Sequence, residues 1–164
     1  MPKAERTGRH EPAEGRIRTV SSGLSLLRSV VAALEHAGVG VLVFGGWAEE
    51  LHGLVPQRGH RDLDLLVIDP DDRVLDAFLD ARREIVAKRA SHKRAFEVDG
   101  TLVELFIVRN EDGQHVTYFW ENVRWVWPTD DGISVAGVRL ASRAALNTYR
   151  SSWDVIRASR PRPG

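Results

Sequence analysis

Two aspartates, Asp62 and Asp64, stand one residue apart at the start of DLDLLVID, an apolar run with the composition of a buried strand. Side chains at positions i and i+2 of a strand point to the same face, so the two carboxylates are expected side by side. Two such charges repel each other, and burying them without a counter-charge is costly. Hard divalent cations prefer oxygen ligands, and Mg²⁺ typically combines one or two carboxylates with substrate phosphates. The pair therefore predicts a metal site.

Glu104 is the only charged residue in the run TLVELFIV, residues 101–108. If this run forms a strand beside residues 62–68, Glu104 completes a triad of acids with the two aspartates. Three acids on neighbouring strands can hold two metal ions that activate an attacking hydroxyl and stabilise the leaving group of a phosphoryl transfer. Glu104 could also take the proton of that hydroxyl. The alternative explanation for Glu104 is a salt bridge with a neighbour such as Lys93 or Arg94.

Two glycines, Gly45 and Gly46, stand where a β-rich run, residues 39–44, turns into a short helix. Glycines at such a turn allow the backbone to approach a phosphate closely. The free N–H groups and positive dipole end of a helix that begins at Trp47 also favour an anion. A plain strand-to-helix connection is the alternative. Together with the acids, however, the glycines predict a site for nucleotidyl transfer.

Further candidates lie beside these motifs. His60 and Arg61 precede the acids, where they could contact nucleotide phosphates or brace the first aspartate, or else be solvated loop residues. Trp47 could lie over the nucleotide or pack in the core. Arg143 and Arg150 could reach a triphosphate from the last helix, or belong to a solvated helix face. The predicted nucleotide-binding residues are therefore Gly45, Gly46, Trp47, His60 and Arg61.

The scaffold for these residues is predicted from the spacing of apolar residues and from turn signals. We expect helices and strands to alternate first, and a β-rich part with an Asp99-Gly100 hairpin to follow. The pattern predicts an α/β (α+β) domain with a mixed, twisted β-sheet flanked by helices. The expected elements are a helix ended by Gly38, a strand over 39–44, a helix over 47–53, a strand over 62–69, a helix over 72–84, strands over 93–98, 101–108 and 115–120, and a last helix over 142–157.

Composition narrows the classes of protein. The 164 residues favour one domain, residues 19–164, preceded by a flexible arm over 1–18 that is rich in charge, Gly and Pro. The absence of cysteine excludes disulfides and thiolate metal sites. No apolar run approaches the roughly 18–20 residues of a membrane span, and the N-terminus does not resemble a signal peptide, so the cytoplasm is the expected location. Formal net charge is zero, which argues against a general nucleic-acid binder.

The motifs resemble the nucleotidyltransferase superfold, and most closely the small lincosamide and aminoglycoside nucleotidyltransferases. The resemblance rests on Gly45-Gly46-Trp47-Ala48 and His60-Arg61-Asp62-Leu63-Asp64, and it covers residues 24–108. It implies transfer of a nucleoside monophosphate, usually AMP from ATP, to a hydroxyl of a small acceptor, with Mg²⁺ held by Asp62 and Asp64. One departure is the third acid, usually an aspartate and here Glu104, whose extra methylene shifts the geometry.

Two other functions remain open at this point. HGLVPQRGHRDLD also resembles nucleotidyltransferase toxins that modify RNA, and the six arginines from Arg139 onward keep a tRNA acceptor in consideration. A non-catalytic relative that only binds a nucleotide is the second. A salt bridge that occupies Glu104 would favour this relative, whereas three carboxylates within about 4–6 Å of one another would favour the enzyme. A site shared across a homodimer would suit so small a domain, but the sequence leaves the oligomeric state open.

Overall fold

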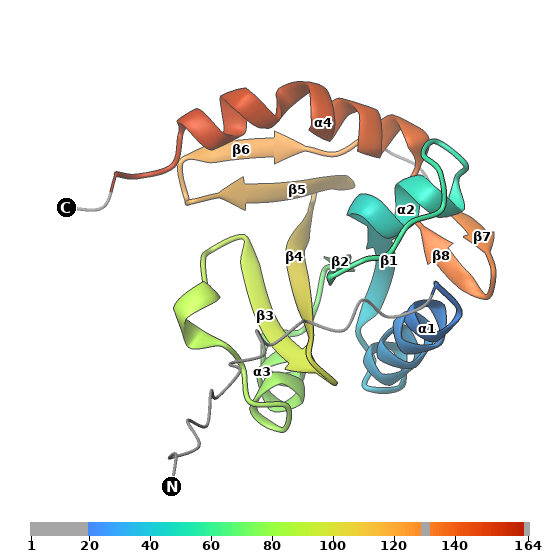
Figure 1. Cartoon of the computed structure of the whole chain (residues 1–164). Helices are drawn as coiled ribbons and strands as arrows, with labels where there is room; N and C mark the ends of the chain where they lie inside the picture. Colours follow the sequence, from blue (N-terminus) through green and yellow to red (C-terminus); the bar gives the residue numbers. More distant parts are fainter. Residues whose placement is uncertain (1–19, 129–131, 163–164) are drawn as a thin grey trace, which may run out of the picture.

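A computed structural model describes residues 20–128 and 132–162 of the chain (Figure 1). The predicted arm over 1–18 lies outside the described residues. Four α-helices, one short 3-10 helix (η1) and eight strands make up the described part. In chain order they are α1 Val20–His36, β1 Gly40–Phe44, α2 Gly45–Leu51, β2 Asp62–Ile68, α3 Asp72–Asp80, η1 Val86–Lys88, β3 Lys93–Val98, β4 Thr101–Glu111, β5 Gln114–Phe119, β6 Val123–Val126, β7 Ile133–Val135, β8 Val138–Leu140 and α4 Arg143–Ala158.

The strands form one mixed sheet in the order β6-β5-β4-β2-β1-β8-β7. Strand β2 lies at its centre, antiparallel to β1 and parallel to β4. The other edge of β4 pairs first with β3 and then, from Arg109 onward, with β5. The predicted mixed sheet flanked by helices is therefore confirmed, and the strand that carries the two aspartates lies directly beside the strand that carries Glu104.

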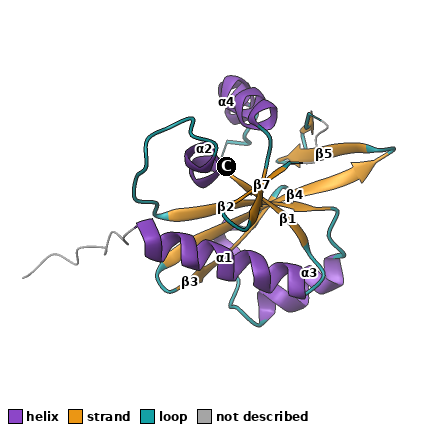
Figure 2. Cartoon of the chain, turned by 90° about the vertical axis from the view of Figure 1, so that its right-hand side faces the viewer, coloured by secondary structure: helices purple, strands orange, loops and turns teal. Residues whose placement is uncertain are grey.

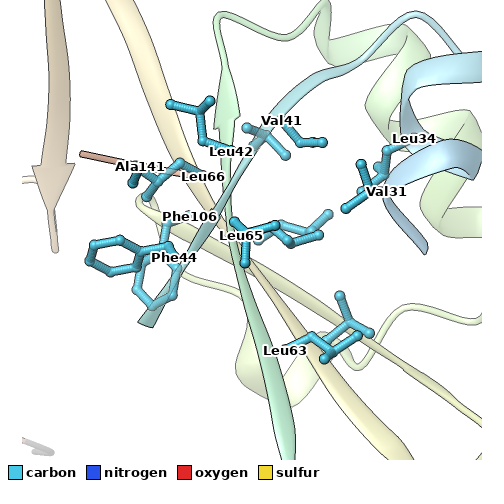
Figure 3. Close-up of a cluster of buried hydrophobic side chains, with 14 of the residues drawn as sticks. Val31, Leu34, Val41, Leu42, Phe44, Leu63, Leu65, Leu66, Phe106 and Ala141 are labelled. Carbon is cyan, nitrogen blue, oxygen red and sulfur yellow. The ribbon is translucent and has the colours of Figure 1, made fainter. Parts of the chain in front are cut away.

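Helices cover both faces of this sheet. Figure 2 shows α1 and α3 on one face and α2 and α4 on the other. Successive side chains of a strand alternate between the faces, and β2 is apolar on both beyond its second aspartate, as expected for a strand buried on both sides. Leu63 and Leu65 point toward the α1 side, whereas Leu66 lies with Phe44 and Phe106 on the α4 side (Figure 3).

Three helices end in the same way, with a residue in the left-handed conformation. Gly38 and Gly53 end α1 and α2 as predicted, each with the two backbone hydrogen bonds of a Schellman motif. The prediction was wrong for α3, which ends at Asp80 rather than at Glu84. There Arg83 adopts the left-handed conformation, at φ 59°. Nothing in the sequence indicated this helix end, because the residue is not a glycine.

Two other boundaries differ from the prediction. Helix α2 begins at Gly45 itself, so both glycines belong to its first turn and no separate turn precedes it. Strand β4 continues to Glu111, past the predicted end at residue 108, because its last residues pair with β5 in a second hairpin. Within the described part of the chain, no helix is long and apolar enough to cross a membrane.

Candidate active site

The strand register brings the three predicted acids to one place. Asp64 and Glu104 are direct partners in the parallel β2–β4 ladder, and Asp62 is opposite Leu102, two residues earlier on the same face. Across the other edge of β2, Asp64 is opposite Phe44, the last residue of β1. Asp62 is exposed, Asp64 is partly buried, and the Glu104 side chain is 15% exposed. The acids thus share the α2–α4 face of the sheet near the start of β2.

Gly45 follows Phe44 and is in close contact with this cluster. Its φ of +60° favours glycine, and a Cβ placed on it would lie only 2.3 Å from Oδ2 of Asp64. The observed reason for a glycine at this position is therefore the carboxylate of Asp64, which occupies the space that a side chain would need. A phosphate contact at Gly45 and Gly46 stays a prediction.

Burial and neighbouring charges change the ionisation of Asp64. Burial is the largest cause that raises its pKa from 3.8 to about 7, and the charges of Asp62 and Glu104 raise it further. The positive charge of Lys93 acts in the opposite direction. The cluster therefore holds more negative charge than the protein neutralises, which is the condition under which a bound cation is favourable.

Glu104 has a lysine partner. Nζ of Lys93 donates to its Oε1 at 2.9 Å, and Nζ of Lys88 lies 3.8 Å from the same oxygen. Arg94, the other predicted partner, instead binds Glu84 and Asp76. The register of the β3–β4 hairpin places Lys93 opposite Phe106, so Lys93 is diagonal to Glu104 on the same face. The Asp99-Gly100 turn sets this register, and the contact could therefore be predicted from the turn. The feature expected to favour a non-catalytic relative is thus present.

The other predicted binding residues differ in exposure. The His60 side chain is 6% exposed and lies between two partners: its Nε2 is 2.5 Å from Oε2 of Glu50, and its ring is 4.3 Å from that of Trp47. Trp47 is only 3% exposed and packs against Gly23, so it is a core residue beneath His60. Arg61 is exposed at the start of β2. The structure brings His60 to the glycines and leaves Arg61 at the surface.

Tyr149 of α4 is a neighbour of the acids that the sequence did not reveal. Its ring lies 5.0 Å from that of Phe44 and stacks on Trp127 at 5.8 Å. Burial is the main cause that raises its pKa, and the charges of Asp64 and Glu104 add to it, so the hydroxyl stays protonated at neutral pH. Trp127 is 4% exposed and belongs to the hydrophobic core.

The donor atoms fit a magnesium ion held by two carboxylates. Asp62 and Asp64 offer hard oxygen ligands on one face, and the space above Gly45 lets the second carboxylate lie against the backbone. Across residues 20–128 and 132–162, no group of three His, Asp or Glu side chains is arranged to hold a metal. The donor set therefore fits a two-carboxylate site, whose remaining ligands substrate would supply.

Comparison with known protein families covers the part of the chain that carries this site. A sequence model of the family described as aminoglycoside-2''-adenylyltransferase matches residues 26–137, more than half of the chain. The match includes the glycines and all three acids and stops before α4. A search of curated protein sequences gave no significant match.

Solved structures show the same fold. The antibiotic-resistance factor ANT(2'')-Ia aligns with a TM-score of 0.59 at 18% identity, over 87% of this chain and 78% of that one. The lincosamide antibiotic adenylyltransferase LnuA aligns with a TM-score of 0.64 at 17% identity, over 79% of this chain and 87% of its own. A putative nucleotidyltransferase from Thermotoga maritima aligns with a TM-score of 0.55 at 18% identity, over 88% and 92%. The predicted nucleotidyltransferase fold is confirmed.

Proposed function

Because the chain belongs to the aminoglycoside-2''-adenylyltransferase family and is a nucleotidyltransferase, we propose that it transfers AMP from ATP to a hydroxyl of a small acceptor. The acceptor we propose is an aminoglycoside-like or lincosamide-like compound. ANT(2'')-Ia has been solved with adenylyl-2''-tobramycin and LnuA with lincomycin, which supports this class. The observation that carries the proposal is the register that sets Asp64 directly beside Glu104 and both on the face of Asp62.

The reaction exchanges a phosphoanhydride bond of ATP for a phosphoester bond to the acceptor. An oxygen of the acceptor hydroxyl attacks the α-phosphorus of ATP, the new O–P bond forms, and the bond from the α-phosphorus to the bridging oxygen of the β-phosphate breaks. Pyrophosphate leaves with that bonding pair, and the hydroxyl proton passes to a carboxylate of the site. A magnesium ion, when bound, neutralises phosphate charge and orients the reacting groups.

The residues of the chain divide these tasks. Asp62 and Asp64 would hold the metal, and Gly45 keeps the second carboxylate in place by leaving it room. Glu104 is the third acid of the site and the proposed proton acceptor, with Lys93 fixing its orientation. Gly46, His60 and Arg61 lie on the side on which we propose that the nucleotide binds, with Trp47 packed beneath His60.

The ion pair of Glu104 with Lys93 is the specific observation in favour of a non-catalytic, nucleotide-binding relative. We give family membership more weight than this ion pair. The lysine does not cancel the charge of Glu104, which still raises the pKa of Asp64. A pair of aspartates that repel each other also has no evident purpose without a cation. A tRNA acceptor is the remaining alternative, and transfer assays with tRNA decide it.

Calorimetry tests the proposal directly. Titrating ATP into the full chain with Mg²⁺ should give binding that disappears with a chelator and in Asp64→Ala. Acceptors should then bind to the ATP-loaded protein, with aminoglycosides and lincosamides ahead of tRNA. Binding of ATP without any transfer would favour the non-catalytic relative, and no nucleotide binding at all would contradict the proposal.

We place this reaction in the cytoplasm, where ATP and Mg²⁺ are available, with drug resistance as the proposed role. A homodimer that shares the acceptor site stays a prediction, and the mass of the chain in solution is its test.

A further inference from the structure

Two arginines from distant parts of the chain form ion pairs with the same glutamate of α2, close to Gly45 and Gly46. Arg58 lies in the loop before β2, and Arg150 lies in the middle of α4. Both form ion pairs with Glu49 of α2: the Arg58 guanidinium at 3.8 Å through Nη2, and Arg150 through a close Nη2–Oε1 contact. Helix α2 packs against α4 (Figure 2), which brings the two guanidinium groups to one edge of the site.

This arginine pair lies next to the proposed reaction centre. A Cβ placed on Gly46 would be 2.9 Å from Nη2 of Arg58, so the guanidinium lies directly over the second glycine. Glu49 is three residues after Gly46 and therefore on the same side of α2. Gly45, the preceding residue, contacts Asp64 in the same way. Two consecutive glycines therefore contact two different groups: Gly45 contacts the Asp64 carboxylate, which we propose holds the metal, and Gly46 contacts the Arg58 guanidinium.

Stability does not explain this arrangement. The side chains of Arg58 and Arg150 are 53% and 64% exposed, and exposed ion pairs contribute only about 0–1 kcal/mol. Two guanidinium groups on one carboxylate also leave one positive charge without compensation within the cluster. If these arginines only formed a solvated helix face, two distant segments would have no reason to meet at Glu49, and Arg58 would have no reason to lie against a glycine.

We propose that Arg58 and Arg150 bind the β- and γ-phosphates of the nucleoside triphosphate and stabilise the pyrophosphate that leaves. The inference rests on the proposed function and specifies which residues hold the donor. Guanidinium groups bind phosphate oxygens in bidentate fashion and act as fixed positive charges where negative charge develops. Glu49 holds both side chains in position before the nucleotide arrives. Arg150 lies beyond residues 26–137, the part that the family model matches, so it is a contribution of α4 in this chain.

The same charges assign the two substrates to different sides. An acceptor that carries several amino groups is repelled by the arginine pair and attracted by the acids. The donor triphosphate therefore lies along α2 toward Arg150, and the acceptor approaches from the side of Glu104 and Tyr149, where the aromatic rings line α4.

Calorimetry on the full chain with Mg²⁺ tests the pair with ATP, AMP and inorganic tripolyphosphate as probes. Arg58→Gln and Arg150→Gln should each weaken ATP and tripolyphosphate binding about tenfold or more, as expected for the loss of a charge-assisted hydrogen bond. AMP, which lacks the β- and γ-phosphates, should bind within about twofold of wild type. Arg157→Gln, a matched change of an exposed arginine on the same helix, should change none of the three. Arg150→Lys, which keeps the charge without the bidentate geometry, should fall between wild type and Arg150→Gln.

The outcomes separate this inference from the proposed function. ATP binding equal to wild type in both glutamine variants overturns the arginine pair and leaves the enzyme intact. An equal loss of ATP and AMP binding, or a loss of the folded near-UV spectrum in Arg150→Gln and Arg150→Lys alike, assigns a structural role to the arginines and also overturns it. Wild-type protein that binds no nucleotide contradicts the proposed function, and the inference fails with it.

Discussion

Replacing Asp64 by asparagine should stabilise the metal-free protein while abolishing transfer. Asparagine has nearly the same shape as aspartate, so it fits the space against Gly45. It carries no charge, and therefore removes the repulsion from Asp62 and Glu104 and the cost of burying a carboxylate. An active-site residue that destabilises its own fold is expected where a ligand supplies the missing charge.

The magnitude follows from the pKa of Asp64. A rise from 3.8 to about 7 disfavours the ionised form by about 4 kcal/mol, since one pKa unit is worth about 1.4 kcal/mol. Below pH 3.8 the carboxyl is protonated in both the folded and the unfolded chain, so it carries no penalty. Between pH 3.8 and 7 the unfolded chain ionises first and wild type loses stability, and above pH 7 the loss is complete. We expect Asp64→Asn to gain about 2–4 kcal/mol at pH 8 and little at pH 4.

Urea denaturation in the presence of chelator, followed from pH 4 to pH 8, measures this difference. Subtracting the two curves is essential because His92 acts in the opposite direction. Burial, together with the charge of Lys93, lowers its pKa to about 4, so its own contribution falls as the pH drops below 6.5 in both proteins. Asp154→Asn, an exposed change on α4, serves as the control and should stay within about 0.5 kcal/mol of wild type. Equal or lower stability of Asp64→Asn at pH 8, or a gain that does not depend on pH, would refute the reasoning.

Three further changes test other contacts of the site. Gly45→Ala places a methyl group 2.3 Å from the Asp64 carboxylate at a φ of +60°, so it should cost about 1–3 kcal/mol in urea denaturation and abolish transfer; an active, stable variant would count against the close contact. His60→Ala removes the side-chain partner of Glu50, whose own side chain is 8% exposed, and should cost about 1–3 kcal/mol in the same assay; an unchanged midpoint would argue against the pair. Lys93→Met removes the positive charge that lowers the pKa of Asp64, so NMR titration should find this pKa higher than in wild type, and an unchanged value would argue against the coupling.

Much of the site could be predicted from local signals. The alternation of β2 placed Asp62 and Asp64 on one face, and the Asp99-Gly100 turn fixed the β3–β4 register that brings Lys93 toward Glu104. These features follow from a period of two residues and a two-residue turn, which need no knowledge of the rest of the chain.

The parts that could not be predicted depend on tertiary packing. Nothing in the sequence of α4 indicates that Tyr149 faces the acids or that Arg150 reaches Glu49, because its amphipathic pattern fixes a buried face but not the neighbour on which that face packs. The sequence predicts a phosphate turn at Gly45, and the structure adds that the Asp64 carboxylate occupies the space that a side chain at this position would need. A glycine marks close approach in a sequence without identifying the group that approaches.

Transfer itself is the most direct test of the central claim. The full chain is incubated with Mg²⁺, ATP labelled at its α-phosphate, and a panel of aminoglycosides and lincosamides, and labelled acceptor and released pyrophosphate are measured together. The account predicts equal amounts of both for at least one acceptor, and neither with chelator or in Asp64→Asn. No labelled acceptor with any nucleoside triphosphate, or transfer that survives in Asp64→Asn, would contradict it.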